Sequence, residues 1–368
     1  SSAASDVYKR QSLFAKPVRF PDAPMTNRYA VLISARNEEK VIGNLIGSIR
    51  DQTYPSNLID IWLVADNCTD NTADIARQEG AVVYTRFNKE QVGKGYALEQ
   101  LLKHIEEDYP DTFDGFFVFD ADNVLDSHFV EAMNRTFCDG YEVVTSYRNS
   151  KNYGDNWISA GYALWFIRES RYLNNSRMLM GTSCAISGTG FLFSRQVIES
   201  TDGWKFHLLT EDIEFSVYHI LQGRTIGFCA DAVLYDEQPA TFRQSWRQRL
   251  RWAKGFLQVF RKYGFGLPAD HRPAGELPGG RRGRLGGGSH GGVPPGAVLC
   301  AADAGGAVRP ALRRGAVHHH HRVGEHPDQR GQEDPLHLHL PHLHAHLHPH
   351  LPGGPVQPGG PVEAHRTP

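Results

Sequence analysis

Short apolar runs alternate with helical segments between Tyr29 and Asp120, and this alternation constrains the fold more than any other feature. The run YAVLIS at 29–34 is followed by polar residues and then by apolar residues at helical spacing up to Ile49. The same order recurs over 59–80 and 81–106, and a last run, FFVFD, ends at Asp120. Strands separated by helices predict βαβ units and an α/β fold with a mostly parallel sheet covered on both faces.

Acidic residues follow the predicted strands at the edge where such sheets bind ligands. In open α/β sheets, ligands lie beyond the carboxyl ends of the strands. Glu38, Asp66 and Asp120 all fall on that edge. The sequence therefore predicts a polar site there.

Composition divides the chain near residue 264. After Phe265 there is no Ile, Lys, Asn, Trp, Tyr or Met, and Gly, Pro, His, Arg, Ala and Leu dominate. Such a composition cannot bury enough apolar surface to offset chain entropy. We therefore expect a leader at 1–28, a catalytic domain at 29–240, a basic amphipathic helix at 241–264 and an unstructured low-complexity tail at 265–368. The first leader residues, SSAASDVYKRQ, are either a disordered leader or, as we favour, a translated sequencing adapter that they resemble.

The tail contains HHHH at 318–321 and the alternating run LHLHLPHLHAHLHPHL at 336–351. His-rich tracts can bind metal, and featureless disorder is another interpretation. However, His codons are CAY and Leu codons mostly CTN, so the neighbouring frame encodes Ile or Thr alternating with Phe, Ser, Tyr or Cys. That composition is typical of a membrane helix. We expect out-of-frame translation after Gly264, with membrane anchors in the parent protein.

Charge and cysteine content exclude several classes of protein. A net charge of -2 and a pI near 6.8 argue against a dedicated nucleic-acid binder. The five cysteines are scattered without a CxxC pair, which predicts neither a disulfide framework nor a zinc site. No uncharged apolar run approaches the roughly 20 residues that a spanning helix needs.

Two carboxylates separated by one residue follow the strand that ends at Asp120. Asp120 and Asp122 supply hard oxygen ligands that suit Mg²⁺ or Mn²⁺, which would bridge a diphosphate. The alternative is a turn in which both residues cap backbone groups.

A second acidic motif, Thr210-Glu211-Asp212, precedes an amphipathic segment. One interpretation is a helix N-cap with acidic residues that complement the helix dipole. The other is a catalytic base, for which we expect an ordinary low pKa. Both can hold together.

Basic and glycine-rich segments complete the candidate motifs. QRLRW at 248–252 lies in a basic amphipathic stretch, predicted to be either a solvated surface helix or an interfacial helix that meets anionic headgroups or a diphosphate. Gly93-Lys94-Gly95 would place an ammonium beside a phosphate, although P-loop spacing is absent. SGTG at 187–190 predicts a tight turn or close backbone approach to a ligand.

The ordered set SARNEE, ADNCTD, VGKGYAL, DAD, SGTGF, TED and QRLRW resembles the processive-type family 2 glycosyltransferases over about residues 29–264. That group includes the cellulose, hyaluronan and poly-N-acetylglucosamine synthases. The resemblance implies a GT-A fold and a Mg²⁺- or Mn²⁺-dependent inverting transfer from a UDP-sugar to a saccharide or lipid acceptor.

On the donor side, the resemblance implies that Glu38 and Asp66 hold uracil and ribose and that Lys94 lies near the donor. Asp120 would contact the nucleotide-sugar and, with Asp122, the metal. The chain departs from many relatives in having SAR in place of a Pro-Thr-Tyr type triplet, and ADN in place of DDG. These departures bear on the uridine contacts.

On the acceptor side, Asp212 would be the catalytic base with Glu211 beside it. Gln248 and Arg251 would face the diphosphate and Trp252 the acceptor. In relatives, membrane helices follow this motif, which implies a membrane-associated parent with a cytoplasmic catalytic domain. A non-processive glycolipid transferase and a nucleotide-sugar-binding pseudoenzyme are the alternatives.

Overall fold

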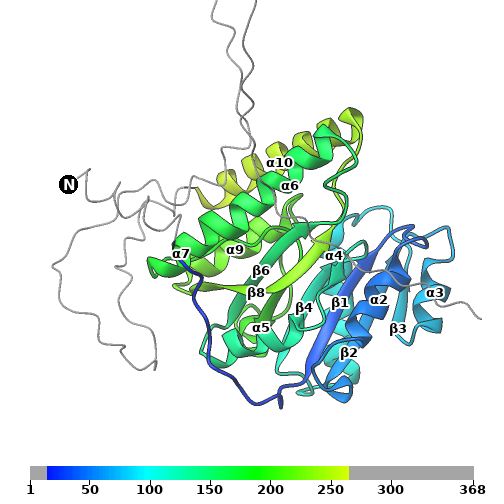
Figure 1. The fold of residues 1–368 in the computed structure, drawn as a ribbon. Helices are drawn as coiled ribbons and strands as arrows, with labels where there is room; N and C mark the ends of the chain where they lie inside the picture. The colour runs from blue at the N-terminus through cyan, green and yellow to red at the C-terminus, as the bar shows by residue number, and fades with distance from the viewer. Residues whose placement is uncertain (1–14, 265–368) are drawn as a thin grey trace, which may run out of the picture. The chain divides into compact units, whose positions relative to one another are not determined.

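A computed structural model describes residues 15–264, which form one eight-stranded sheet with helices against both faces (Figure 1). The adapter-like segment and the low-complexity tail lie outside the described residues. Within 15–264, no helix combines the length and the apolar character needed to cross a membrane.

The first half of the described chain carries the predicted alternation. Its elements are β1 (Tyr29–Ala35), α2 (Ile42–Arg50), η1 (Ser56–Leu58), β2 (Ile59–Asp66), α3 (Thr72–Gln78), β3 (Val82–Arg86), α4 (Lys94–Asp108), β4 (Gly115–Asp120), β5 (Val124–Leu125) and α5 (Phe129–Cys138). The strands and helices predicted between Tyr29 and Asp120 are thus confirmed, with small shifts at their ends.

The second half is less regular. Its elements are β6 (Val143–Ser150), α6 (Trp157–Ile167), the π-helical η2 (Arg168–Asn174), α7 (Asn175–Leu179), β7 (Phe191–Ser194), α8 (Arg195–Glu199), α9 (Glu211–Leu221), β8 (Ile226–Asp236) and α10 (Phe242–Tyr263). Helix α9 begins directly after Thr210, at the predicted N-cap.

The strand order is β3-β2-β1-β4-β7-β6-β8-β5, with four parallel and three antiparallel pairings. Strands β1 to β4 are mutually parallel, as predicted. Strand β7 starts beside the end of β4, where Val118 pairs with Phe191, and runs back to pair Gly115 with Ser194. This reversal brings the SGTG segment next to the end of β4.

Both faces of the sheet are buried. Along β1, Val31 and Ile33 pack with α2, α3 and α5, whereas Ala30 and Leu32 pack with α4, α8 and α9. Successive residues of a strand point to opposite faces, so an uninterrupted apolar run fills both cores. Apolar residues fill the two cores on the faces of the sheet. The polar loops at the carboxyl ends of the strands lie outside these cores and are therefore where we expect a site.

Candidate active site

Four of the predicted donor-side residues meet at one edge of the sheet. Asp66 ends β2 and Asp120 ends β4, and the register pairs Ser34 of the intervening β1 with Asp120. Glu38 lies in the loop after β1, and burial followed by the charge of Asp120 raises its pKa. Lys94 begins α4. The structure thus places these four residues at the predicted edge of the sheet.

Lys94 links three of the sequence motifs. Its Nζ donates to Asp120 Oδ1 at 2.5 Å and to the carbonyl of Gly188 at 2.8 Å, and lies 3.9 Å from Glu211 Oε1. A Cβ on Gly95 would lie 2.1 Å from the Phe206 carbonyl oxygen, so a glycine there lets α4 begin close against the segment that leads to Glu211. One ammonium thus bridges the DAD, SGTG and TED motifs.

Two carboxyl groups of the DAD and TED motifs have raised pKa values. Burial, together with Asp236 and Asp120, raises the pKa of Asp122 to about 8. Burial also raises the pKa of Glu211 to about 7, against the opposing effect of Lys94. Such groups are typical of functional sites, because burial without full compensation disfavours the charged form.

Asp212 differs from its predicted chemistry in one respect. Burial raises its pKa, so the expectation of an ordinary low pKa is wrong, although hydrogen bonds from backbone N–H groups at the start of α9 oppose the shift. The hydroxyl of Thr210 makes no capping hydrogen bond, so this residue is an N-cap by position only. Desolvation by the packed loops outweighs the helix start.

The SGTG segment passes directly beside Asp212. A Cβ on Gly188 would lie 3.9 Å from Asp212 Oδ2, and Gly188 and Gly190 have φ of 81° and 67°. A Cβ on Gly190 would also lie 1.9 Å from the side chain of Leu234. The tight turn predicted for SGTG therefore describes its geometry, and close approach to a ligand stays a prediction.

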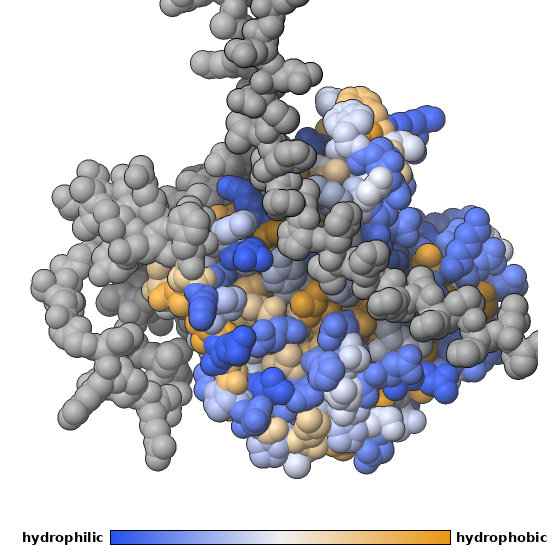
Figure 2. All heavy atoms as spheres, viewed as in Figure 1, coloured by the Kyte–Doolittle hydropathy of each residue, from blue (hydrophilic) through white to orange (hydrophobic). Residues whose placement is uncertain are grey.

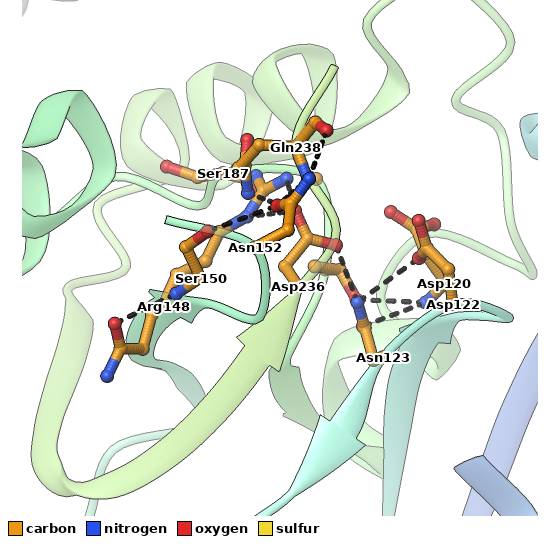
Figure 3. A network of polar contacts seen from close by, with 12 residues as sticks. Asp120, Asp122, Asn123, Arg148, Ser150, Asn152, Ser187, Asp236 and Gln238 are labelled. Carbon is orange, nitrogen blue, oxygen red and sulfur yellow. Dashed lines mark hydrogen bonds and ion pairs between the residues drawn. The ribbon is translucent and has the colours of Figure 1, made fainter. Parts of the chain in front are cut away.

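A polar network behind the DAD motif was not predicted from the sequence (Figure 3). It joins Asn123 of the DAD loop, Arg148 of β6, Asp236 at the end of β8 and Gln238. Asn123 adjoins the DAD triplet, whereas Arg148, Asp236 and Gln238 each lie at or near a strand end with no recognisable motif around them. The only sequence signal is that polar residues interrupt otherwise apolar strands.

Asp66 lies in a different electrostatic setting. Its carboxylate accepts hydrogen bonds from Arg86 at 2.7 Å and from Arg36 at 2.5 Å. The Asp66 and Arg86 side chains are 4% and 5% exposed, whereas Arg36 is 45% exposed. Arg36, which stands in the departing SAR triplet, therefore covers Asp66 on the accessible side.

The three QxxRW residues face different surroundings on α10. Trp252 packs against Tyr162 and Phe166 of α6, with ring centroids 5.9 and 6.3 Å apart. Arg251 is exposed, and the buried Oε1 of Gln248 has no hydrogen-bond partner. No hydrogen bond or ion pair within 15–264 joins these three residues to the DAD or TED carboxylates.

Helix α10 nevertheless packs against the start of α9. A Cβ on Gly255 would lie 2.5 Å from Thr210, so a glycine is needed at that crossing. Lys262 donates to the buried Glu214 of α9 at 2.7 Å. The QxxRW helix is thus attached to the helix that carries Asp212.

Asp120 and Asp122 have the donor chemistry for a divalent cation. Both supply carboxylate oxygens, and the unfavourable burial of Asp122 beside two other carboxylates would be relieved by positive charge. Among the residues that the structure describes, no group of three or more His, Cys, Asp or Glu side chains is placed to hold a metal. The oxygen donors of Asp120 and Asp122 fit a hard divalent cation.

A family model described as "Glycosyltransferase like family 2" matches residues 26–255, more than half of the chain. The chain belongs to glycosyltransferase family 2. The match includes the DAD, SGTG and TED motifs of this glycosyltransferase and the QRLRW segment of α10.

Two curated relatives show the range of the family around this glycosyltransferase. It is 26% identical over 244 residues to the beta-monoglucosyldiacylglycerol synthase of Nostoc sp. strain PCC 7120, covering 64% of this chain and 50% of the relative. It is 25% identical over 233 residues to the poly-beta-1,6-N-acetyl-D-glucosamine synthase of Staphylococcus aureus strain COL, covering 62% and 54%. The chain thus spans about half the length of these relatives.

A solved structure supports the fold. The mannosyltransferase PcManGT from Pyrobaculum calidifontis, in complex with GDP-Man and Mn²⁺, aligns with a TM-score of 0.56 at 18% identity, covering 82% of this chain and 77% of the other. The glycosyltransferase therefore has the predicted α/β fold of the GT-A type.

Proposed function

We propose that this glycosyltransferase moves a sugar from a UDP-sugar to an acceptor hydroxyl with inversion, assisted by Mg²⁺ or Mn²⁺. The observation that carries the proposal is the position of Lys94, which contacts Asp120 and the Gly188 carbonyl and lies 3.9 Å from Glu211. A single cation between the DAD and TED motifs suits a donor whose diphosphate enters between them.

The proposed reaction is a single displacement. The acceptor oxygen forms a bond to the anomeric carbon, UDP leaves from the opposite face, and Asp212 accepts the hydroxyl proton. The raised pKa of Asp212 suits this role, since a base works best when its pKa approaches the working pH. A divalent cation bound by Asp120 and Asp122 would supply positive charge to the departing diphosphate.

For the nucleoside, we propose contacts at the loops after β1 and β2. Glu38 remains a candidate for direct contact with the nucleoside, because its carboxylate lies at the same edge as Asp120 and close enough for the charge of Asp120 to raise its pKa. Asp66 would act through Arg36, whose exposed guanidinium offers donors to the carbonyl oxygens of uracil.

We propose that the acceptor is met at a membrane surface on the cytoplasmic side. Gln248, Arg251 and Trp252 would then lie near the donor diphosphate and the acceptor. Helix α10 has seven Lys and Arg residues and no acidic residue. Its outer apolar residues, Trp246 among them, are 48 to 65% exposed, and Trp157 at the start of α6 is 77% exposed. Figure 2 shows apolar surface at the tip of the molecule where α6 and α10 begin. An exposed apolar stripe with basic residues favours an interface with anionic lipid.

Vesicle flotation tests this surface. Wild type should bind vesicles that contain phosphatidylglycerol, and Trp246→Ser together with Leu257→Ser should weaken that binding several-fold without lowering the melting temperature. Val82→Ser, at an exposed apolar residue of β3, is the control.

Two kinds of product are compatible with these residues. The resemblance to processive enzymes favours a polymer, whereas the similarity to the Nostoc glycolipid synthase favours a single added sugar. Chromatography of radiolabelled product separates them by length. A nucleotide-sugar-binding pseudoenzyme would make neither product.

Turnover of the full chain tests the proposed chemistry. Release of UDP from UDP-glucose or UDP-N-acetylglucosamine, with diacylglycerol micelles as acceptor, should fall about 10²- to 10⁴-fold in Asp212→Asn. UDP affinity should stay unchanged. Asp202→Asn, at an exposed loop residue before α9, is the matched control and should behave as wild type. Equal turnover in Asp212→Asn and wild type would remove Asp212 from the mechanism.

A further inference from the structure

Asp236 is a buried carboxylate that lies outside all of the sequence motifs. It ends β8, is 2% exposed, and accepts hydrogen bonds from three side chains. Asn123 Nδ2 donates to it at 2.8 Å, Gln238 Nε2 at 2.9 Å and Arg148 Nε at 3.0 Å, with a second, closer contact from Arg148 Nη2. Figure 3 shows these donors converging on one carboxylate.

Through Asn123, Asp236 is connected to the DAD loop. Asn123 is fully buried, and its Oδ1 accepts from the backbone N–H of Asp120 at 3.2 Å and from the hydroxyl of Thr189. Its amide also lies 3.4 Å from Asp122 Oδ1. The orientation of Asn123 is thereby fixed, and with it the backbone that carries both DAD carboxylates.

Through Arg148, Asp236 is connected to the SGTG loop. Arg148 Nη1 donates to the Ser187 carbonyl at 2.7 Å, and its guanidinium lies 3.7 Å above the Phe166 ring of α6. With the bonds from Lys94 to Gly188 and from Thr189 to Asn123, three consecutive residues of this loop are held from three directions.

A purely stabilising ion pair is the simpler explanation, but it accounts poorly for this arrangement. Buried ion pairs contribute little net stability, because desolvation offsets most of their attraction. Here Asp236 is also bonded to the loop that carries Asp122, and Arg148 is also bonded to the loop that passes beside Asp212. The contacts run toward the site rather than toward the core.

We propose that Arg148 and Asp236 are positioning residues that hold the DAD and SGTG loops at a fixed separation, so that Asp120 and Asp122 stay aligned opposite Asp212. The inference rests on the proposed function, because it concerns how the donor diphosphate is received. Neither residue need touch the donor.

Calorimetry of the full chain with UDP, with and without Mn²⁺, tests this proposal. Asp236→Asn retains one acceptor oxygen for three donor side chains, and Arg148→Lys keeps the charge but cannot reach both Asp236 and Ser187. In each variant the enhancement of UDP affinity by Mn²⁺ should fall about 10- to 100-fold, while metal-free UDP affinity changes less than about twofold. Within residues 15–264, no hydrogen bond or ion pair joins the nucleoside loops after β1 and β2 to Arg148 or Asp236, which is why metal-free binding should persist.

Asp60→Asn is the matched control. It breaks an ion pair with Arg28 near the amino end of β2, at the opposite edge of the sheet, and should leave both affinities unchanged. Melting temperatures establish that each variant is folded. If Asp236→Asn does not fold, the result for Arg148→Lys alone decides.

Three outcomes have distinct meanings. Wild type without Mn²⁺-dependent UDP binding would overturn the proposed function itself. Wild type with such binding, and variants with the same enhancement, would overturn only the positioning role. Variants that lose metal-free and Mn²⁺-dependent affinity in equal measure would show a structural role, which also overturns the proposal.

Discussion

Two groups of buried carboxylates in the sheet differ in how fully their charge is compensated. On the side of β1 to β3, Asp66 is neutralised by Arg36 and Arg86. On the side of β4 and α9, Asp122 and Glu211 have pKa values raised to about 8 and 7. The first arrangement is complete in the protein alone, whereas in the second the nearby Lys94 and Arg148 do not fully offset burial and the neighbouring carboxylates.

We propose that this difference separates scaffold from reaction centre. A buried charge that its partners satisfy holds the fold in one geometry. Carboxylates left without enough compensation are unfavourable until a cation binds, and such groups cluster where ligands are received. We therefore expect mutations in the first half to change stability, and mutations in the second half to change metal binding and turnover.

The largest expected effect is on stability in the paired half. Asp66→Asn leaves the guanidinium of Arg86 buried without its carboxylate, which should lower the free energy of unfolding by about 3–5 kcal/mol. Urea denaturation measures the change. Asp74→Asn, which breaks the exposed pair with Arg77, should cost less than about 1 kcal/mol. Equal effects of the two substitutions would contradict the distinction.

Next in size is the effect of Lys94→Met on turnover. It removes the ammonium between Asp120 and Glu211 and should lower kcat about 10²- to 10³-fold, as the loss of one preorganised donor does. Lys103→Met, at an exposed position of the same helix, should leave kcat unchanged. Steady-state UDP release from a UDP-sugar measures both. A Lys94 variant with normal turnover would place the reaction elsewhere.

The smallest expected effect is a gain in stability from Asp122→Asn. A carboxyl whose pKa is raised on folding, here from 3.8 to about 8, binds its proton more tightly in the native state. The metal-free chain therefore loses stability as the pH rises from about 4 through 8. The substitution should raise the melting temperature at pH 8 by at least roughly 2–4 °C, about 1 kcal/mol, with little change at pH 4.

Asp126→Asn, at a half-exposed residue of the same loop region, is the control for this titration. A melting temperature of Asp122→Asn that falls at pH 8 would mean that the carboxylate is stabilising. The charge imbalance on the β4 side would then be absent.

The sequence predicts the first half of the sheet well, because local patterns determine it. The strand that ends at Asp120 and the helix that starts at Lys94 can each be predicted from the spacing of apolar residues and from the polar residues that bound them. The antiparallel direction of β7 cannot be predicted in this way, since it depends on where the preceding loop brings the chain back to the sheet. Its pairing with β4 is a long-range contact that no local period encodes.

The site divides in the same way. Lys94, Asp120 and Asp212 lie in recognisable triplets, so the sequence could single them out as candidates. Arg148 and Asp236 could not be singled out, because their proposed role arises from two strands that meet only in the folded sheet. The pKa of Asp212 was predicted wrongly for a related reason: desolvation depends on which loops cover a carboxylate, and sequence spacing does not show that.

The most direct test of the central claim is the binding of UDP to the full chain, measured by calorimetry in Mn²⁺ and again in EDTA. If the carboxylates beside Lys94 receive a cation and a nucleotide diphosphate together, Mn²⁺ should strengthen UDP binding by a factor of about 5 to 150, the usual range for coupled ligands. Equal affinity in the two conditions, or no binding in either, would contradict it.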